Sequence, residues 1–392
     1  SWSRGLGDVY KRQDWIFGLE VITGLFLALL ITFFIQFLGP IGGLVVFLLG
    51  NGISSFGSFY IFNSFSYLVD PISPLVICLI CYLVVTFFNF LFTELERSKV
   101  RNAFSQYMSP VMVEKLAQSS ESLKLGGERK EMTFLFSDIR GFTSISEKYK
   151  GDPEALTDLI NNLLTVLSNE ILNNQGTIDK YMGDCIMAFW NAPSDDPEHR
   201  EKSIDAAFAM SKALEQLNKD LDRHDEDKLS VGIGINTGDC IVGNMGSDKR
   251  FDYTVLGDAV NLASRLEGQS GNYGMQIILG EGSIQGLSKD KYSVCELDLI
   301  AVKGKSEPVK IYTVFNKEDS EFADESFLLE HQDFLKNYRS QNWLKAKEHI
   351  DKYRFSKTEF TLYYSLFLER IDELSKQTLP NDWSGVFIAK TK

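Results

Sequence analysis

Hydrophobic and polar positions divide the chain into two parts of different character. Between Asp14 and Glu96 there is no Lys or Arg, and apolar residues run with few interruptions. Three apolar stretches, at 21–38, 41–61 and 75–92, each approach the ~20 residues that a helix needs to cross a bilayer. They predict three transmembrane helices within residues 14–93. A buried hairpin of a soluble protein is the alternative interpretation.

The pattern changes to alternating strands and helices over residues 131–316. Residues 132–136 form a short apolar run suited to a central strand, and residues 153–172 repeat their apolar positions with a helical period. Residues 176–180 and 185–190 can pair as a hairpin whose turn carries Gly183-Asp184. The mixed order predicts an α+β sandwich in which helices pack on a mainly antiparallel sheet.

The remaining segments flank this predicted domain. Residues 94–130 begin with helical spacing and end in a polar stretch, which predicts a signalling helix followed by a linker. Residues 321–392 have helix-turn-helix spacing, which predicts a helical tail, either as a packed hairpin or as one tetratricopeptide-like repeat. Residues 1–13 resemble neither a targeting signal nor a membrane flank, and we interpret them as a sequencing or assembly scar.

Charge indicates an orientation and excludes one class of partner. Arg97, Lys99 and Arg101 follow the third apolar stretch, and cations beside a span mark the cytoplasmic side. We therefore expect a multi-pass protein of the inner (plasma) membrane, in contact with its lipid, whose larger part is cytoplasmic. The net charge of -13 gives no basic footprint for nucleic acid. The five cysteines show no zinc-like spacing and are interpreted as reduced, packed side chains.

Two aspartates follow strand-like stretches and suggest a metal site. Asp138 and Asp184 would supply carboxylates at neighbouring strand ends, and the Ile139 carbonyl could supply a further oxygen. Hard oxygen ligands suit Mg²⁺. Such ions neutralise the charge of a nucleoside triphosphate and activate an attacking hydroxyl. Taken singly, Asp138 could instead cap a helix and Asp184 could simply occupy a turn.

Further polar residues suit phosphate chemistry. Asn261 and Arg265 are four residues apart in a helix predicted from Asp258, so their side chains lie on one face. A guanidinium there can stabilise charge that develops on a phosphate, and the amide can orient a ribose. Lys303 follows a strand-like run, where an ammonium could meet the terminal phosphates. The alternatives are an ordinary amphipathic turn and a solvated surface lysine.

Three runs resemble the catalytic domain of class III adenylate and guanylate cyclases, in the order found in that family. They are Phe-Ser-Asp-Ile-Arg-Gly-Phe-Thr at 136–143, Lys-Tyr-Met-Gly-Asp at 180–184, and Tyr-Thr-Val-Leu-Gly-Asp-Ala-Val-Asn-Leu-Ala-Ser-Arg-Leu at 253–266. The resemblance implies a ferredoxin-like sandwich. It also implies metal binding by Asp138 and Asp184, adenine recognition by Lys180 and Thr254, transition-state support by Asn261 and Arg265, and binding of the terminal phosphates by Lys303.

The resemblance also implies a substrate and an assembly. Guanylate cyclases of the family carry Glu and Cys at the two base-reading positions, whereas this chain has Lys180 and Thr254, so ATP is the expected substrate. Two Mg²⁺ or Mn²⁺ ions are expected in each active site. Family sites form between two catalytic domains, and because this chain carries the whole residue set, a homodimer with two equivalent sites is expected.

The membrane region resembles that of bacterial cyclases in which three spans follow an extracytoplasmic CHASE-type sensor. The sensor is missing from this sequence, and with it the site for a regulatory ligand. The sequence thus predicts a membrane-anchored adenylate cyclase that makes 3′,5′-cyclic AMP and pyrophosphate. A catalytically silent signalling and dimerisation module is the alternative. A diguanylate cyclase would need a Gly-Gly-Asp/Glu-Glu-Phe run, and a transporter would need intramembrane charges.

Overall fold

The structure is a computed structural model, and it divides into two compact units, Ser1–Met108 and Ser109–Lys392. It describes residues 14–105, 126–223, 228–247, 250–301, 307–318, 325–355, 357–380 and 383–388. The predicted scar at residues 1–13 and most of the predicted linker therefore lie outside the described residues.

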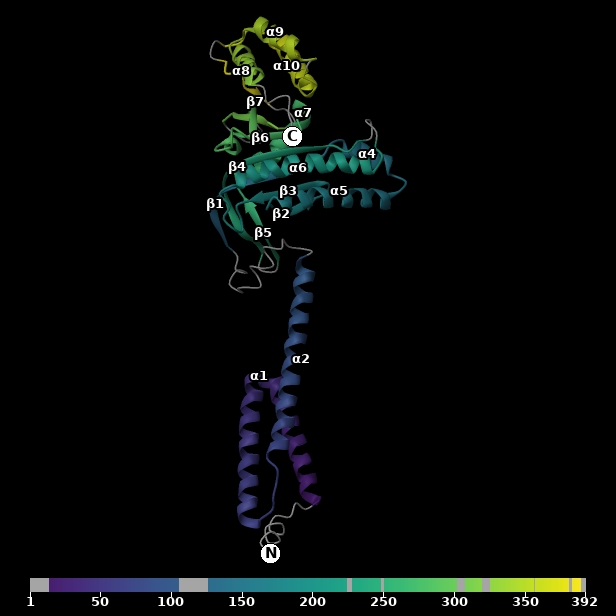
Figure 1. The fold of residues 1–392 in the computed structure, drawn as a ribbon. Coiled ribbons are helices and arrows are strands. Elements are labelled where there is room, and N and C mark those ends of the chain that lie inside the picture. Colours follow the sequence, from purple (N-terminus) through teal and green to yellow (C-terminus); the bar gives the residue numbers. More distant parts are fainter. Residues whose placement is uncertain are drawn as a thin grey trace. The chain divides into compact units, whose positions relative to one another are not determined.

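The N-terminal unit consists of helix α1 (Asp14–Phe65) and helix α2 (Ile72–Ser105). The backbone of α1 leaves helical geometry at Gly39, with φ 72° and ψ -173°, immediately before Pro40. Glycine adopts a positive φ without the strain of a Cβ atom, and proline lacks a backbone donor. The two halves of α1 run back along each other (Figure 1), and an added Cβ at Gly50 would lie 2.6 Å from Leu27.

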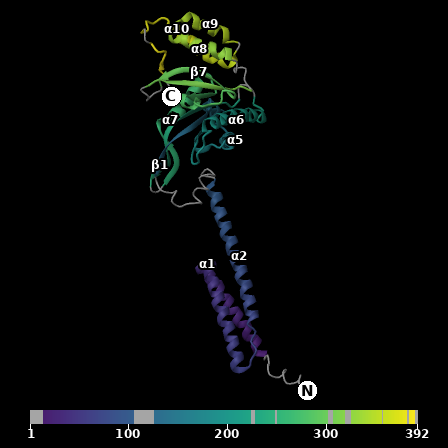
Figure 2. The ribbon, with the colours of Figure 1, turned by 60° about the vertical axis from the view of Figure 1, so that its left-hand side comes forward.

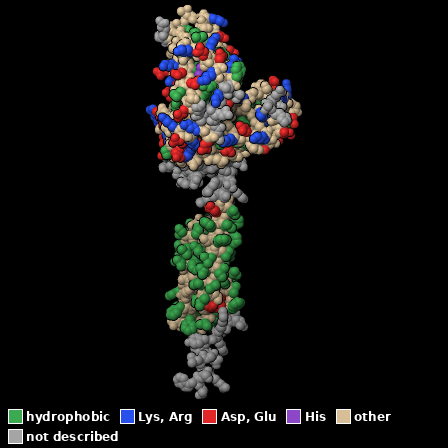
Figure 3. Space-filling model, turned by 45° about the horizontal axis from the view of Figure 1, so that its top comes forward, with side chains coloured by type: hydrophobic (Ala, Val, Ile, Leu, Met, Phe, Trp, Pro, Cys, Tyr) green, Lys and Arg blue, Asp and Glu red, His purple; other side chains and the backbone are tan. Residues whose placement is uncertain are grey.

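Three separate transmembrane helices are predicted, whereas the described chain has two helices that are long and apolar enough to cross a membrane, and the first of them turns back on itself at Gly39. They are Trp15–Phe65 and Ile72–Leu95. The first two predicted spans belong to α1, where only Gly39 departs from helical geometry. Apolar spacing alone did not reveal that the helix resumes directly at Pro40. Hydrophobic side chains cover the visible surface of this unit (Figure 3).

Helix α2 also joins two predicted elements. It begins with the third apolar stretch and continues without a break to Ser105, into the predicted signalling helix. The backbone amide of Asp70 donates to Glu20 Oε1 at 2.7 Å, and the Ser58 hydroxyl donates to the Val69 carbonyl at 2.6 Å. A small apolar cluster lies between α1 and α2, formed by Leu27, Ile31, Ile35 and Cys78.

The C-terminal unit is built on one mixed sheet, which confirms the predicted α+β class with a mainly antiparallel sheet. The order of the described strands is β2-β3-β1-β4-β6-β8-β7-β9, and β5 pairs with β4. Only the β4–β6 and β7–β9 pairs are parallel among these strands. Their bounds are β1 Gly126–Ile139, β2 Thr177–Met182, β3 Cys185–Trp190, β4 Val231–Ser247, β5 Arg250–Leu256, β6 Ile277–Gly280, β7 Tyr292–Ala301, β8 Val309–Asn316 and β9 Phe387–Ile388.

Helices cover both faces of this sheet. Side chains of β1 alternate, so that Leu135 packs with α5 and α6 while Phe134 packs in a second cluster with α7. Helix α5 starts after Asp152, whose carboxylate accepts a hydrogen bond from the Ala155 amide at 3.0 Å. The helices are α4 Phe142–Lys148, α5 Pro153–Asn173, α6 His199–Asp220 and α7 Asp258–Tyr273, with a 3-10 turn, η2, at Glu281–Ile284.

Helix α7 lies unusually close to strand β4. A Cβ atom at Gly234 would lie 2.2 Å from the backbone nitrogen of Glu267, and one at Gly232 would lie 2.1 Å from Ser270 Oγ. The Asn236 side-chain amide donates to the Ala259 carbonyl at 2.8 Å, which ties down the first turn of α7. The two glycines therefore set the distance between this helix and the sheet.

The C-terminal helices pack against the same sheet and against α7 (Figure 2). They are α8 Glu325–Arg339, α9 Trp343–Tyr353 and α10 Thr361–Leu374, with a 3-10 turn, η4, at Thr358–Phe360. Tyr273 of α7 and Phe334 and Phe367 of the tail belong to one buried cluster. The described residues between 325 and 388 are thus packed into the core of the C-terminal unit, and strand β9 extends the sheet beside β7.

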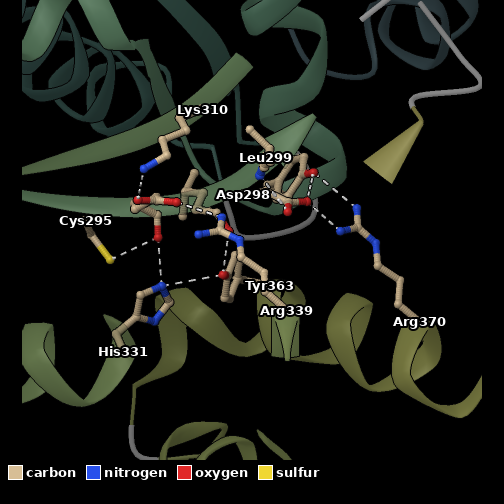
Figure 4. A network of polar contacts seen from close by, with 11 residues as sticks. Cys295, Asp298, Leu299, Lys310, His331, Arg339, Tyr363 and Arg370 are labelled. Carbon is tan, nitrogen blue, oxygen red and sulfur yellow. Dashed lines mark hydrogen bonds and ion pairs between the residues drawn. The ribbon is translucent and has the colours of Figure 1, made fainter. Parts of the chain in front are cut away.

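A polar network secures this packing (Figure 4). Arg370 Nη1 and the Tyr273 hydroxyl both donate to Asp298 Oδ2, each at 2.6 Å. His331 is completely buried, its Nε2 lies 2.9 Å from the Glu296 carbonyl, and burial lowers its pKa to about 3. His331 is therefore neutral at pH 7. The cation in this network is Arg370, which pairs with the buried carboxylate of Asp298.

Replacing Gly234 by Ala tests the close contact between β4 and α7. We expect Gly234→Ala to destabilise the C-terminal unit by about 1–3 kcal/mol, because the methyl group would meet backbone that cannot rotate away. Gly271→Ala is the matched control, since an added Cβ there meets no described atom within 4 Å. Alanine also favours the helix at that position. Thermal unfolding of both variants measures the difference, and equal stability would contradict the assigned constraint.

Candidate active site

The structure brings Asp138 and Asp184 together. Asp138 is near the end of β1, and Asp184 belongs to the two-residue turn between β2 and β3, where Gly183 has φ 69°. β1 pairs with β3 such that Ser137 lies opposite Ile186, which places both carboxylates at one end of the sheet. Burial raises the pKa of Asp138 to about 6, and the charge of Asp184 contributes to the rise.

This carboxylate pair fits a cation. The Asp184 Oδ2 atom is buried and has no hydrogen-bond partner in the described chain, and two adjacent carboxylates disfavour each other's charge. The described residues contain no group of three or more His, Cys, Asp or Glu side chains arranged around a metal position. Asp138, Asp184 and the Ile139 carbonyl would therefore hold ions whose other ligands come from water or from a phosphate substrate.

A third carboxylate, Glu267, lies beside this pair, and sequence reasoning did not identify it. Its Oε1 atom is on the side of α7 that faces Gly232, the residue paired with Asp138 in the sheet. Burial, and after it the charge of Asp138, raises the pKa of Glu267 to about 7, whereas the charge of Arg140 acts to lower this pKa. Its position two residues after Arg265 was the only signal in the sequence.

Lys180 and Thr254 come together at a second place, through Asp179. The Thr254 hydroxyl donates to Asp179 Oδ2 at 2.6 Å, and Lys180 Nζ lies 3.7 Å from Asp179 Oδ1. The register of β2 shifts between Ile178 and Lys180, so Asp179 is the extra residue of a bulge. Sequence reasoning missed Asp179, although its position immediately before Lys180 in a predicted strand was a usable signal.

Asn261 and Arg265 occupy the first half of α7. The backbone nitrogen of Asn261 donates to the Gly257 carbonyl at 3.3 Å. Asn261 is exposed, and Arg265 is half-buried. Arg265 Nη1 is buried and has no hydrogen-bond partner among the described residues. A guanidinium nitrogen without a partner is suited to receive an anion. Lys303 lies outside the described residues, so the structure does not place it.

Asp184→Asn tests the electrostatic conflict in the carboxylate pair. A raised pKa means that the fold disfavours the charged form of Asp138, so the conflict is present above pH 6 and absent once Asp138 is protonated. We expect the metal-free variant to unfold roughly 2 °C above the unmodified protein at pH 8. This advantage should disappear as the pH falls through about 6.

Added Mn²⁺ should stabilise the unmodified protein and have little effect on the Asp184→Asn variant. Asp290→Asn, which changes an exposed carboxylate, serves as the control and should behave as the unmodified protein does. Thermal unfolding with a chelator and with Mn²⁺ makes the measurement. An Asp184→Asn variant that is less stable without metal would contradict the conflict between the two carboxylates.

Comparison with known proteins gives this arrangement a family context. Residues 127–316 match the adenylate and guanylate cyclase catalytic domain. The chain is 35% identical over 224 residues to an adenylate cyclase of Anabaena cylindrica, which covers 55% of this chain and 43% of that protein. It is 33% identical over 220 residues to adenylate cyclase 1 of Rhizobium meliloti, covering 55% of this chain and 33% of that protein.

Solved structures match the same region. The adenylyl cyclase CyaB from P. aeruginosa is 42% identical with a TM-score of 0.45, and the match covers 50% of this chain and 98% of that chain. The guanylyl cyclase Cya2 is 33% identical with a TM-score of 0.42, and the match covers 48% of this chain and 94% of that chain. The chain spans less than half the length of the two curated relatives described above.

Proposed function

The chain belongs to the adenylate and guanylate cyclase family through residues 127–316, and on this basis we propose that it is a membrane-anchored adenylate cyclase that converts ATP to 3′,5′-cyclic AMP and pyrophosphate. The observation that carries the proposal is the charge-conflicted pair of Asp138 and Asp184 at one end of the sheet. The second polar group, Lys180 with Thr254, supports it as the place where a base is recognised.

Asp138, Asp184 and the Ile139 carbonyl would hold two Mg²⁺ or Mn²⁺ ions. Divalent ions bound there would neutralise phosphate charge and lower the pKa of the ribose 3′-hydroxyl. The support for this assignment is the unpartnered Asp184 oxygen and the raised pKa of Asp138, which both favour a cation between the carboxylates. Glu267 adds negative charge beside the same position.

The reaction needs one bond to form and one to break. The ribose 3′-oxygen forms a bond with the α-phosphorus and loses its proton to solvent, while the bond from that phosphorus to the pyrophosphate oxygen breaks. Arg265, with a buried nitrogen that lacks a partner, would stabilise the charge on the transferring phosphate. Asn261 would orient the ribose, and Lys303 would bind the terminal phosphates.

Two copies of the chain would form each active site. One copy would supply Asp138 and Asp184, and the other would supply Lys180, Thr254, Asn261 and Arg265. Exposed apolar side chains on β2, β4 and β5 support an interface with a second copy, because such side chains are costly to leave in water. Their exposed fractions are Tyr181 49%, Met182 46%, Ile241 50% and Leu256 60%.

The two apolar helices would anchor the enzyme in the inner (plasma) membrane as a multi-pass protein. Their length and composition support this, and α2 continues beyond its apolar part to Ser105 in one helix. The effect of a regulatory ligand that binds an extracytoplasmic sensor would be transmitted to the catalytic domain through this helix. Basic residues after the apolar stretch support a cytoplasmic position for the catalytic domain.

Mixing two inactive variants tests both the activity and the shared site. Asp138→Asn and Arg265→Ala should each abolish cyclic AMP production from ATP and Mn²⁺, because each variant lacks one necessary group in both sites. An equal mixture of dissociated and reassembled chains should recover about one quarter of the original activity, since half of the dimers are mixed and each has one intact site.

As the control, each variant is dissociated and reassembled on its own, and it should stay inactive. Recovery that does not exceed this control, with mixed dimers shown to have formed, would contradict the composite site. A folded dimer of the unmodified chain that binds ATP but makes no cyclic product would instead support a catalytically silent signalling module.

A further inference from the structure

We propose that Asp179 is a specificity-determining residue that holds the Thr254 hydroxyl as a hydrogen-bond acceptor and thereby selects adenine over guanine. This inference rests on the proposed function for the nucleotide substrate and deepens it. It adds a residue that touches no substrate itself and acts through its neighbours, so Asp179 is a positioning residue.

The first step of the argument is that Asp179 is committed to internal contacts. Its side chain is 1% exposed, although Lys180 next to it is 42% exposed in its side chain. Asp179 Oδ2 accepts the Thr254 hydroxyl proton at 2.6 Å, and Asp179 Oδ1 is buried without a hydrogen-bond donor. The register of β2 shifts at Asp179, where its carboxylate is buried and the neighbouring lysine side chain is partly exposed.

The second step follows from the chemistry of a hydroxyl group. A threonine hydroxyl has one proton and two lone pairs, and an ionised carboxylate can only accept. Because Thr254 gives its proton to Asp179, only lone pairs of its oxygen remain for a ligand. The exposed side of Thr254 is therefore a hydrogen-bond acceptor and cannot serve as a donor.

The third step is the match to the base. Adenine presents an amino group as a donor at position 6, whereas guanine presents a carbonyl oxygen there. An acceptor-only Thr254 can bind the adenine amino group and would face the guanine oxygen with unpaired lone pairs. A buried polar mismatch of this kind is costly, so a Thr254 hydroxyl that can only accept discriminates strongly between adenine and guanine.

Lys180 completes the same arrangement. Its ammonium lies 3.7 Å from Asp179 Oδ1, so the carboxylate limits the positions that this flexible side chain adopts. An ammonium group is donor-only, which suits the unprotonated ring nitrogen N1 of adenine and opposes the N1–H of guanine. Asp179 would therefore orient both a donor and an acceptor toward one base edge.

Asp179→Asn is the direct test, because it keeps the size of the side chain and changes its hydrogen bonding. The amide oxygen should turn toward the Lys180 cation and the amide NH₂ toward Thr254. Thr254 Oγ1 would then accept, and its own proton would be free to point at the base. We expect the ratio of kcat/KM for ATP to kcat/KM for GTP to fall at least tenfold, mainly through a loss with ATP.

A double-mutant cycle separates this role from a purely structural one. Thr254→Val removes the hydroxyl through which Asp179 is proposed to act, so Asp179→Asn should change the ATP-to-GTP ratio little in that background. Thr254→Ser keeps the hydroxyl and should preserve the ratio. An Asp179→Asn effect that is equally large with and without the Thr254 hydroxyl would overturn the proposal.

The experiment also separates failure of the inference from failure of the proposed function. If the unmodified full chain turns over neither triphosphate, the cyclase proposal fails, and titration calorimetry with ATP and with GTP in Mn²⁺ then decides the inference. A preference for ATP that Asp179→Asn reduces only in the presence of the Thr254 hydroxyl supports it. Equal binding of ATP and GTP by the unmodified chain, or binding of neither, overturns it.

Discussion

The close contact between helix α7 and strand β4 is the constraint on which the C-terminal unit depends. Gly234 leaves no room for a side chain against the α7 backbone, so any larger residue would push the helix outward. That helix carries Asn261 and Arg265 on one side and places Glu267 near the Asp138 and Asp184 pair. A displacement of α7 at this contact would therefore move Asn261, Arg265 and Glu267 together.

The same helix connects the catalytic domain with the C-terminal segment. Tyr273 near its end donates to Asp298 of β7, which also receives Arg370 from α10. Asp298 is 1% exposed, and burial raises the pKa of its carboxyl group, whereas the Arg370 cation and the Tyr273 hydroxyl act to lower it. The C-terminal helices thus hold the far end of the helix whose beginning carries the predicted transition-state residues.

Three of the carboxylate sites buried in the described part of this unit differ in how their charge is balanced. Asp298 has a guanidinium partner, and Asp179 has a hydroxyl donor with an ammonium nearby. Asp138 and Asp184 have mainly each other, and burial followed by the charge of Asp184 raises the pKa of Asp138 to about 6. A protein maintains such an unbalanced pair at a cost in stability, and a bound cation removes that cost. The balance of charge distinguishes Asp298, which has a guanidinium partner, from the Asp138 and Asp184 pair, which a cation would stabilise.

The sequence by itself determined the class of fold and the residue types of the site, because strand and helix periods and short polar runs are local properties. It predicted the metal aspartates, the Asn261 and Arg265 pair on α7, and the apolar N-terminal region. It did not determine the reversal of α1 at Gly39, the burial of Asp179 at the bulge in β2, or the approach of Glu267 to Asp138. Only the tertiary structure decided these, because each depends on which backbone lies opposite a residue far away in the chain, and the local pattern does not contain that relation.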